Sequence, residues 1–153
     1  MRKLYILVAM LYCGVATSFV SGREDIVAQT DGYVSSREWS FRPVTMQNPA
    51  LGSTRDLEQY NLYFNLAGDV ATVHLPVEWV SMSIFTEEFT VAIENYSATF
   101  VADDYWRILF TFEYNSEQWA IEVAAEPTTG KVELAMVTRQ GTMRYIGSFW
   151  KLF

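Results

Sequence analysis

Hydrophobic and polar residues alternate along most of this chain, most regularly over residues 104–137. From Trp106 to Tyr114 every second residue is apolar, whereas Arg107 and Glu113 lie between those positions. Successive side chains of a strand point to opposite faces, so this pattern predicts a strand with one face in the core. Two further alternating stretches follow after short turn sequences rich in Asn, Ser, Pro and Gly. Three strands joined in this way predict an antiparallel meander.

A second strong signal is a hairpin around Gly68-Asp69. Residues 60–66 and 70–75 alternate on either side of these two residues, and Pro76 ends the second arm. Weaker alternation elsewhere brings the total to about eight short strands, the spacing typical of all-β domains. The sequence therefore predicts an all-β fold: a single antiparallel β domain, either a sandwich or a partly open barrel, rich in meanders. No amphipathic helix is predicted.

Two stretches depart from this pattern. Pro43 follows the alternating residues 39–42, and because proline has no N–H to donate, it predicts an edge strand or a strand end. Val77 to Phe85 is apolar without alternation. We expect it to be an irregular segment that crosses the sheet and packs its large side chains against it.

The beginning of the chain has the pattern of an export signal. Arg2 and Lys3 are followed by 17 uncharged residues, Leu4 to Val20, and by small residues at a cleavage position ending at Gly22. We therefore predict a signal peptide at residues 1–22, a flexible leader at 23–36 and the β domain at 37–153. The alternative is a membrane anchor that is never cleaved, but the uncharged run is shorter than the ~20 residues of a typical span. After cleavage no membrane span is expected.

Cys13 is the only cysteine and lies inside the predicted signal. A lipoprotein signal places a small residue before its lipidated cysteine, whereas Tyr12 is bulky, so a lipid anchor at Cys13 is disfavoured. The prediction is an exported protein, periplasmic or secreted. Its mature part has no thiol for a disulfide, a metal or nucleophilic catalysis.

The charge balance is acidic. The full chain carries −7, and removing Arg2 and Lys3 with the signal gives −7 − 2 = −9, because residues 1–22 contain no Asp or Glu. Nucleic acids and anionic membrane surfaces select basic proteins, so neither is an expected partner.

Few residues carry recognisable chemistry. His74 is the sole histidine, and the chain has no Gly-x-Ser-x-Gly motif. One histidine without a mature cysteine excludes the usual zinc ligand sets. The acidic pairs Glu87-Glu88 and Asp103-Asp104 consist of strand neighbours that point apart, so we interpret them as solvated strand ends. No catalytic, metal-binding or cofactor-binding residue is assigned.

Aromatic residues make up 16% of the chain, which is high for a domain of this size. Core packing is their default use, and the alternative is an exposed strip that would stack on sugars or peptides. The candidate ligand surface lies where the polar face of the meander meets the segment at 77–85. It consists of Tyr63, Trp79, Arg107, Glu113 and Glu122. A glycan, a peptide or another envelope protein are the candidate partners.

Two classes of function remain open. The first is a non-enzymatic binding or structural module of the cell envelope. The alternative is a periplasmic hydrolase that uses carboxylates, which requires two of them to face each other across a pocket. Exposure of Asp104, Glu113 and Glu122 to open solvent would argue against the hydrolase.

Three pieces of the sequence resemble a known family: Trp39-Ser-Phe41, the hairpin from Tyr60 to Pro76, and Arg144-Tyr-Ile-Gly147. They resemble exported Bacteroidetes proteins known as domain of unknown function four-two-five-one, over residues 38–150. The resemblance implies an antiparallel β fold and an envelope or secreted location. Many relatives are lipoproteins, a pattern from which Tyr12 departs. The family provides no activity to carry over.

Overall fold

The computed structural model describes residues 26–78 and 84–152 and is built almost entirely of antiparallel strands. Twelve strands lie in these two ranges. They are β1 (Glu38–Asn48), β2 (Ser53–Asp56), β3 (Tyr63–Ala67), β4 (Val70–His74), β5 (Pro76–Glu78), β6 (Ile84–Thr86), β7 (Phe89–Ala92), β8 (Glu94–Val101), β9 (Tyr105–Tyr114), β10 (Glu117–Ala125), β11 (Val132–Thr138) and β12 (Gly141–Trp150). This confirms the all-β class, although several predicted strands are divided into shorter ones.

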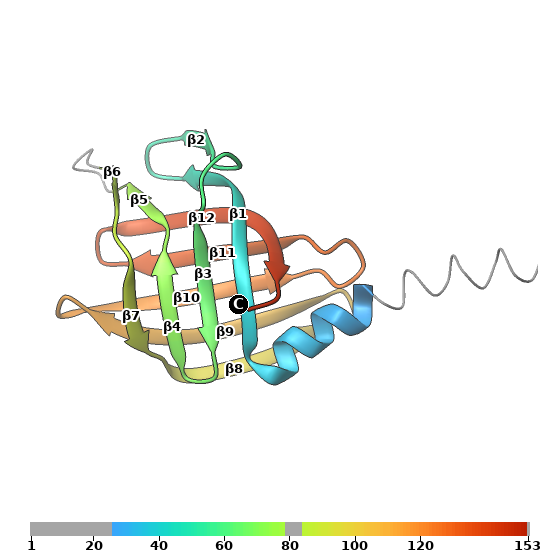
Figure 1. Ribbon diagram of the computed structural model, residues 1–153. Coiled ribbons are helices and arrows are strands. Elements are labelled where there is room, and N and C mark those ends of the chain that lie inside the picture. Colours follow the sequence, from blue (N-terminus) through green and yellow to red (C-terminus); the bar gives the residue numbers. More distant parts are fainter. Residues whose placement is uncertain (1–25, 79–83, 153) are drawn as a thin grey trace, which may run out of the picture.

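Ten of the strands form one sheet in the order β7-β4-β3-β1-β12-β11-β10-β9-β8, with β2 attached to β1. Figure 1 shows the sheet curling back on itself, so that β1, β3, β4 and β7 lie across the layer formed by β8 to β12. One sheet that rolls toward a barrel therefore forms both layers. Of the two architectures that the sequence allows, this is the partly open barrel.

The barrel is held at its open seam by aromatic packing. Its two edge strands, β7 and β8, follow each other in sequence and meet at Ile93, and no strand pairing joins them within the described residues. Instead, the Phe89 ring on β7 stacks on Tyr114 of β9 with centroids 3.8 Å apart and contacts Phe112 at 6.0 Å. These contacts bring the two edges together without a hydrogen-bonded ladder.

The predicted core faces of the meander are confirmed. Ile108, Phe110 and Phe112 of β9 are buried, and they face buried positions on β10 and β11. The turn between β9 and β10 consists of Asn115 and Ser116, which both have positive φ, 52° and 61°. A two-residue turn with this backbone is the type that matches the twist of a hairpin.

Pro43 does not mark an edge or a strand end, so that prediction is wrong. It lies inside β1, which is paired with β12 on one side and β3 on the other. The pairing of β1 with β12 shifts by one residue between Pro43 and Thr45. The bulge leaves Val44 out of the ladder with β12, and on the other side of β1 the pairing with β3 ends at Phe41 and that with β2 begins at Thr45. Pro43 lies in this gap, so its missing N–H is tolerated there.

Residues 26–36 form a helix, which corrects the predicted flexible leader over this range. Thr30 and Val34, one turn apart, are buried against the barrel. Asp31 accepts a hydrogen bond of 2.7 Å from the indole N–H of Trp106 on β9, and the Tyr33 ring contacts Phe149 of β12. The apolar stripe of this helix is too short to be recognised in the sequence. Contacts with the barrel stabilise the helix. The predicted signal peptide and Cys13 lie outside the described residues.

The apolar segment Val77 to Phe85 is also more regular than expected. Its two described ends belong to β5 and β6, which pair antiparallel as a separate two-stranded sheet. The prediction of an irregular crossing segment is therefore wrong for these ends. Trp79 and the rest of residues 79–83 lie outside the described residues.

Candidate functional site

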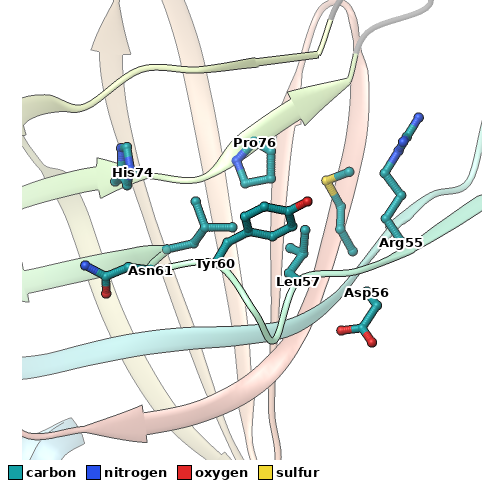
Figure 2. Close-up of a pocket in the computed structure, with 9 residues that line it drawn as sticks. Arg55, Asp56, Leu57, Tyr60, Asn61, His74 and Pro76 are labelled. Carbon is teal, nitrogen blue, oxygen red and sulfur yellow. The ribbon is translucent and has the colours of Figure 1, made fainter.

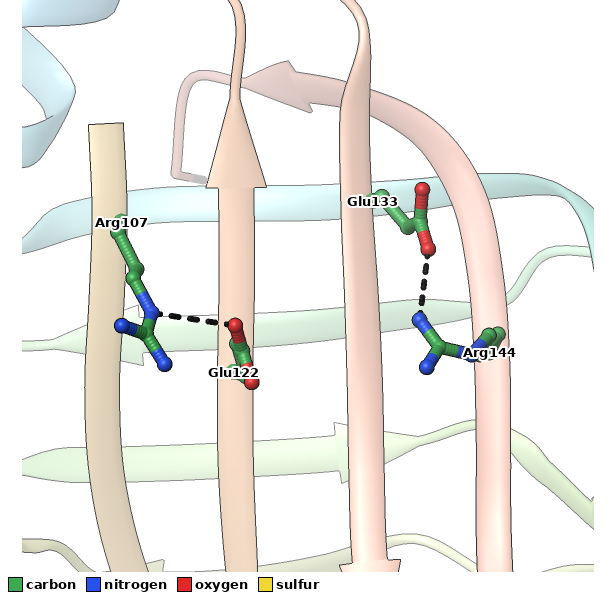
Figure 3. Close-up of polar contacts among 4 residues, drawn as sticks. All are labelled: Arg107, Glu122, Glu133 and Arg144. Atoms are coloured by element: carbon green, nitrogen blue, oxygen red, sulfur yellow. Dashed lines mark hydrogen bonds and ion pairs between the residues drawn. The ribbon is translucent and has the colours of Figure 1, made fainter. Parts of the chain in front are cut away.

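Arg107 and Glu122, two residues of the predicted ligand surface, form an ion pair on the outer face of the barrel. The guanidinium Nε of Arg107 lies 3.2 Å from the Glu122 carboxylate, and both side chains are about half exposed, 48% and 50%. A second pair, Arg144 with Glu133, lies beside it at 3.0 Å (Figure 3). These four charges therefore neutralise each other in pairs.

The five predicted residues do not form one surface. Arg107, Glu113 and Glu122 lie on β9 and β10, whereas Tyr63 lies on β3, and the sheet order places β1, β12 and β11 between β3 and β10. Figure 1 shows these two groups of strands on opposite walls of the barrel. Glu113 is exposed, and Trp79 lies outside the described residues.

Replacing Arg107 with glutamine is expected to change the free energy of unfolding by less than about 1 kcal/mol, because exposed ion pairs contribute little. Urea unfolding of the variant measures the difference. The matched control is Arg144→Gln, which removes the neighbouring ion pair, whose side chains are exposed to a similar extent. A loss of several kcal/mol from Arg107→Gln alone would show that this face has a structural role that the geometry does not explain.

Tyr63 takes part in a polar cluster on its own wall. Its hydroxyl donates a hydrogen bond to Glu88, its ring lies 5.3 Å from the His74 ring, and the Arg42 guanidinium lies 5.7 Å above it. The neighbouring Glu87 accepts a 2.9 Å hydrogen bond from Tyr114 of β9. This hydrogen bond, and to a lesser extent burial, raises the pKa of Tyr114. The exposed pair Glu87-Glu88 thus connects β3 and β9 across the seam.

A pocket of about 830 Å³ lies near this cluster, between β2 and the end of β4. Its lining residues are Met46, Arg55, Asp56, Leu57, Tyr60, Asn61, Leu62, His74 and Pro76. Met46, Leu57 and Leu62 are buried and form an apolar floor. Tyr60 is 57% exposed, and Figure 2 shows its ring beside Leu57 and Pro76. The volume is within the range of small-molecule sites, ~300–1,000 Å³.

Backbone hydrogen bonds position the loop that forms one wall of this pocket. β2 folds back on β1, and the Leu57 N–H then donates to the Val44 carbonyl at 2.7 Å. The Tyr60 N–H donates to the Leu57 carbonyl at 3.0 Å, which closes a turn. Leu57 is thereby directed into the protein, while Tyr60 lies at the opening of the pocket.

The other wall is attached to the barrel through Pro76. The carbonyl of Pro76 accepts a 2.7 Å hydrogen bond from the hydroxyl of Tyr145 on β12, which is fully buried. Burial raises the pKa of Tyr145 well above the usual value, so this hydroxyl stays protonated and keeps donating. The pocket is therefore built on the rigid part of the fold.

Most of this pocket could not be identified from the sequence. His74 is an isolated histidine there, and the alternation at Tyr60 and Leu62 predicts a strand. The pocket residues come from β1, β2, the loop at 57–62, the end of β4 and the start of β5. The available signal was Leu57, an apolar residue among charged ones, but nothing local shows that it faces Pro76.

Asp104, Glu113 and Glu122, the candidate carboxylates of the hydrolase, are exposed, and none of them lines this pocket. Asp104 lines a second pocket of about 460 Å³ together with Asp31 and Asp103. No three His, Cys, Asp or Glu side chains of residues 26–78 and 84–152 are grouped closely enough to hold a metal ion. In the same ranges, no helix has the length and apolar character needed to cross a membrane.

Comparison with solved structures gives a similar fold. The crystal structure of a DUF4251 family protein from Bacteroides eggerthii matches with a TM-score of 0.69, over 86% of this chain and 91% of that one, at 9% sequence identity. This is the family that the sequence resembles, and its name assigns no function. Neither the family models nor the curated proteins give a match.

Proposed function

We propose that this chain is an exported, non-enzymatic binding module of the cell envelope, of the DUF4251 type, which holds a small ligand in the pocket between β2 and the end of β4. The observation that carries the proposal is the pocket itself: a cavity of about 830 Å³ with an apolar floor and a few polar groups at its rim. This combination is the usual form of a small-molecule site.

The pocket also has the rigidity that a binding site needs. Its floor residues Met46 and Leu57 are part of the core cluster, and its walls are held by hydrogen bonds to β1 and β12. A preformed cavity of this kind binds without the cost of ordering its walls. An apolar ligand would mainly cover the exposed ring of Tyr60, because the floor residues are already buried in the protein.

The carboxylate-dependent hydrolase has less support. Its candidate residues Asp104, Glu113 and Glu122 are exposed, and Glu122 is paired with Arg107. A hydrolytic pair needs two carboxylates that face the same substrate. Asp56 is the one carboxylate among the described lining residues of the pocket.

Binding is tested with N-phenyl-1-naphthylamine, a neutral apolar probe whose fluorescence rises when it leaves water. We expect saturable binding to the wild-type protein and about tenfold weaker binding to Tyr60→Ala, which corresponds to about 1.4 kcal/mol. Phe100→Ala is the matched control, because Phe100 is an exposed aromatic residue that does not line this pocket. No binding, or equal weakening in both variants, would contradict the proposed site.

Export is tested separately by the intact mass of the protein recovered from a bacterial host. Cleavage after Gly22 would leave residues 23–153, with no lipid added. A mass that includes Cys13 and a lipid would contradict the soluble exported form, and an uncleaved mass would contradict the signal peptide.

A further inference from the structure

We infer that the second pocket, at the other side of the fold, binds a small organic cation of the quaternary ammonium type. This pocket of about 460 Å³ lies where the helix at 26–36 packs against the end of β8 and the start of β9. It shares no lining residue with the pocket between β2 and the end of β4. The inference therefore stands independently of the function proposed for that pocket.

Two aromatic rings line the second pocket. Phe100 of β8 and Trp106 of β9 are opposite each other in the strand pairing, with ring centroids 5.2 Å apart and ring planes tilted by 49°. Phe100 is 41% exposed, so the core does not use all of its ring. The face of an aromatic ring carries partial negative charge and attracts cations, and grouped rings are the usual recognition device for quaternary ammonium ions.

A carboxylate of the helix lies beside these rings. Asp31 accepts the 2.7 Å hydrogen bond from the indole N–H of Trp106 through one oxygen, which fixes the Trp106 ring against the helix. Its other oxygen has no hydrogen bond within the described residues. Asp31 is partly buried, and a charge that is partly removed from water acts more strongly on a neighbouring charge than an exposed one does.

The remaining charges of the second pocket are also negative. Asp103 and Asp104 line it from the turn between β8 and β9, and within the described residues neither carboxylate has a hydrogen bond or an ion pair. None of the described lining residues is Lys, Arg or His. This distinguishes the pocket from the outer face of the barrel, where Arg107 neutralises Glu122. The net charge of −7 adds to the attraction for a cation.

The spacing of the carboxylates favours an organic cation over a metal ion. A calcium ion needs about six or more oxygen ligands at roughly 2.4 Å. No three acidic side chains of the described residues are grouped closely enough to hold a metal. A quaternary ammonium ion spreads its charge over several carbon atoms and presents an apolar surface, so it needs neighbouring rings and nearby carboxylates but no coordinating oxygens.

The same charges favour a free cation over the head group of a choline lipid. In such a head group a phosphate lies next to the ammonium. The second pocket presents Asp31, Asp103 and Asp104 and no described cationic side chain that could pair with the phosphate, so a phosphate would be repelled. We therefore expect a ligand without an acidic group near its ammonium.

The test compares three ligands by isothermal titration calorimetry on the wild-type protein. Choline is the cation, 3,3-dimethyl-1-butanol is its neutral isostere with carbon in place of nitrogen, and phosphocholine adds the phosphate. Choline is expected to bind at least about tenfold more tightly than either of the others. Equal binding of choline and the alcohol, or no binding of choline, overturns the inference.

Two variants connect this preference with the second pocket. Phe100→Leu keeps an apolar side chain and removes the ring, so it should weaken choline binding about threefold or more and affect the alcohol less. The double variant Asp103→Asn/Asp104→Asn keeps the side-chain size and removes two charges, so the preference for choline over the alcohol should fall about tenfold. A preference that survives both variants would place choline elsewhere and overturn the site.

Two control variants should leave choline binding unchanged. Trp150→Leu removes a ring that is 56% exposed and does not line the second pocket. Glu113→Gln removes an exposed carboxylate outside it, which tests whether general acidity explains the binding. The thermal midpoint of every variant is measured to check that it is folded. Weakening by the controls equal to that by the pocket variants would contradict a specific site.

Two competitors test the class of ligand. Calcium chloride at constant ionic strength should not displace choline, and displacement at a concentration equal to that of choline would assign a metal site and overturn the organic cation. Phosphocholine that binds as tightly as choline would overturn the free cation. None of these outcomes affects the pocket between β2 and the end of β4, which is tested with a different probe.

Discussion

Replacing Gly147 with alanine is expected to destabilise the protein by more than about 3 kcal/mol, or to prevent folding. Gly147 on β12 lies opposite Pro43, next to the bulge in β1. A Cβ at this position would lie 1.9 Å from the Arg42 carbonyl oxygen and 2.9 Å from the Pro43 Cα. Both are backbone atoms, so no side chain can rotate away, and the pairing of two central strands would have to open.

The measurement is the free energy of unfolding in urea, with soluble yield as a first indication. Gly32→Ala is the matched control, because a Cβ there meets nothing within 4 Å and Gly32 lies in the helix at 26–36. Alanine is favoured over glycine in a helix by about 1 kcal/mol, so the control should be slightly stabilised. Equal effects of the two substitutions would show that the close approach at Gly147 is not a constraint.

Replacing Tyr145 with phenylalanine is expected to cost about 1–3 kcal/mol. The variant keeps the ring in the core and removes the hydroxyl that donates to the Pro76 carbonyl at 2.7 Å. That carbonyl would then be left unpaired in a buried environment, which is costly. Tyr60→Phe, at an exposed ring, is the control and should be close to neutral.

The same variant predicts a difference at alkaline pH. Burial raises the pKa of Tyr145 in the folded protein, whereas in the unfolded chain the hydroxyl has a pKa of about 10. Below pH ~10 the hydroxyl makes its full contribution to the stability of the folded protein. Above it the unfolded chain releases a proton that the folded chain retains, so wild-type stability falls by about 1.4 kcal/mol per pH unit. The raised pKa values of Tyr96 and Tyr114 affect the wild type and Tyr145→Phe alike, so they cancel when the two are compared.

Urea unfolding at about pH 8, 10 and 11 measures this effect. The stability advantage of the wild type over Tyr145→Phe should be constant at the lower values and shrink above about pH 10. An advantage that stays constant across the series would show that Tyr145 ionises as readily in the folded protein as in the unfolded chain.

Most of the strands and their buried faces could be predicted from the sequence, because the period of two is local. Phe110, Trp119 and Leu134 lie inside the barrel as their alternation indicates. The Gly68-Asp69 hairpin is confirmed for the same reason: β3 and β4 pair with Ala67 opposite Val70, and Gly68 has a positive φ of 63°. Turn chemistry and alternation act over a few residues and need no tertiary information.

The helix at 26–36 and the place of Pro43 could not be predicted. The helix buries Thr30 and Val34, and it is stabilised by the barrel through contacts such as that of Asp31 with Trp106. Pro43 is compatible with a central strand because it lies beside the bulge in the pairing with β12 and between the stretches of β1 that pair with β3 and with β2. Both features depend on residues distant in the sequence.

The class of the fold, the faces of its strands and the acidity of the chain follow from local periodicity and composition, so all three can be predicted from the sequence. The rolling of one sheet into a partly open barrel depends on strand order, which is set by contacts between distant segments. The candidate site depends on the same contacts. The distant residues Leu57, His74 and Pro76 line one pocket because the sheet brings the end of β4 to the loop after β2. Arg107 and Tyr63, which were predicted to lie together, lie on opposite walls because four strands separate β3 from β9.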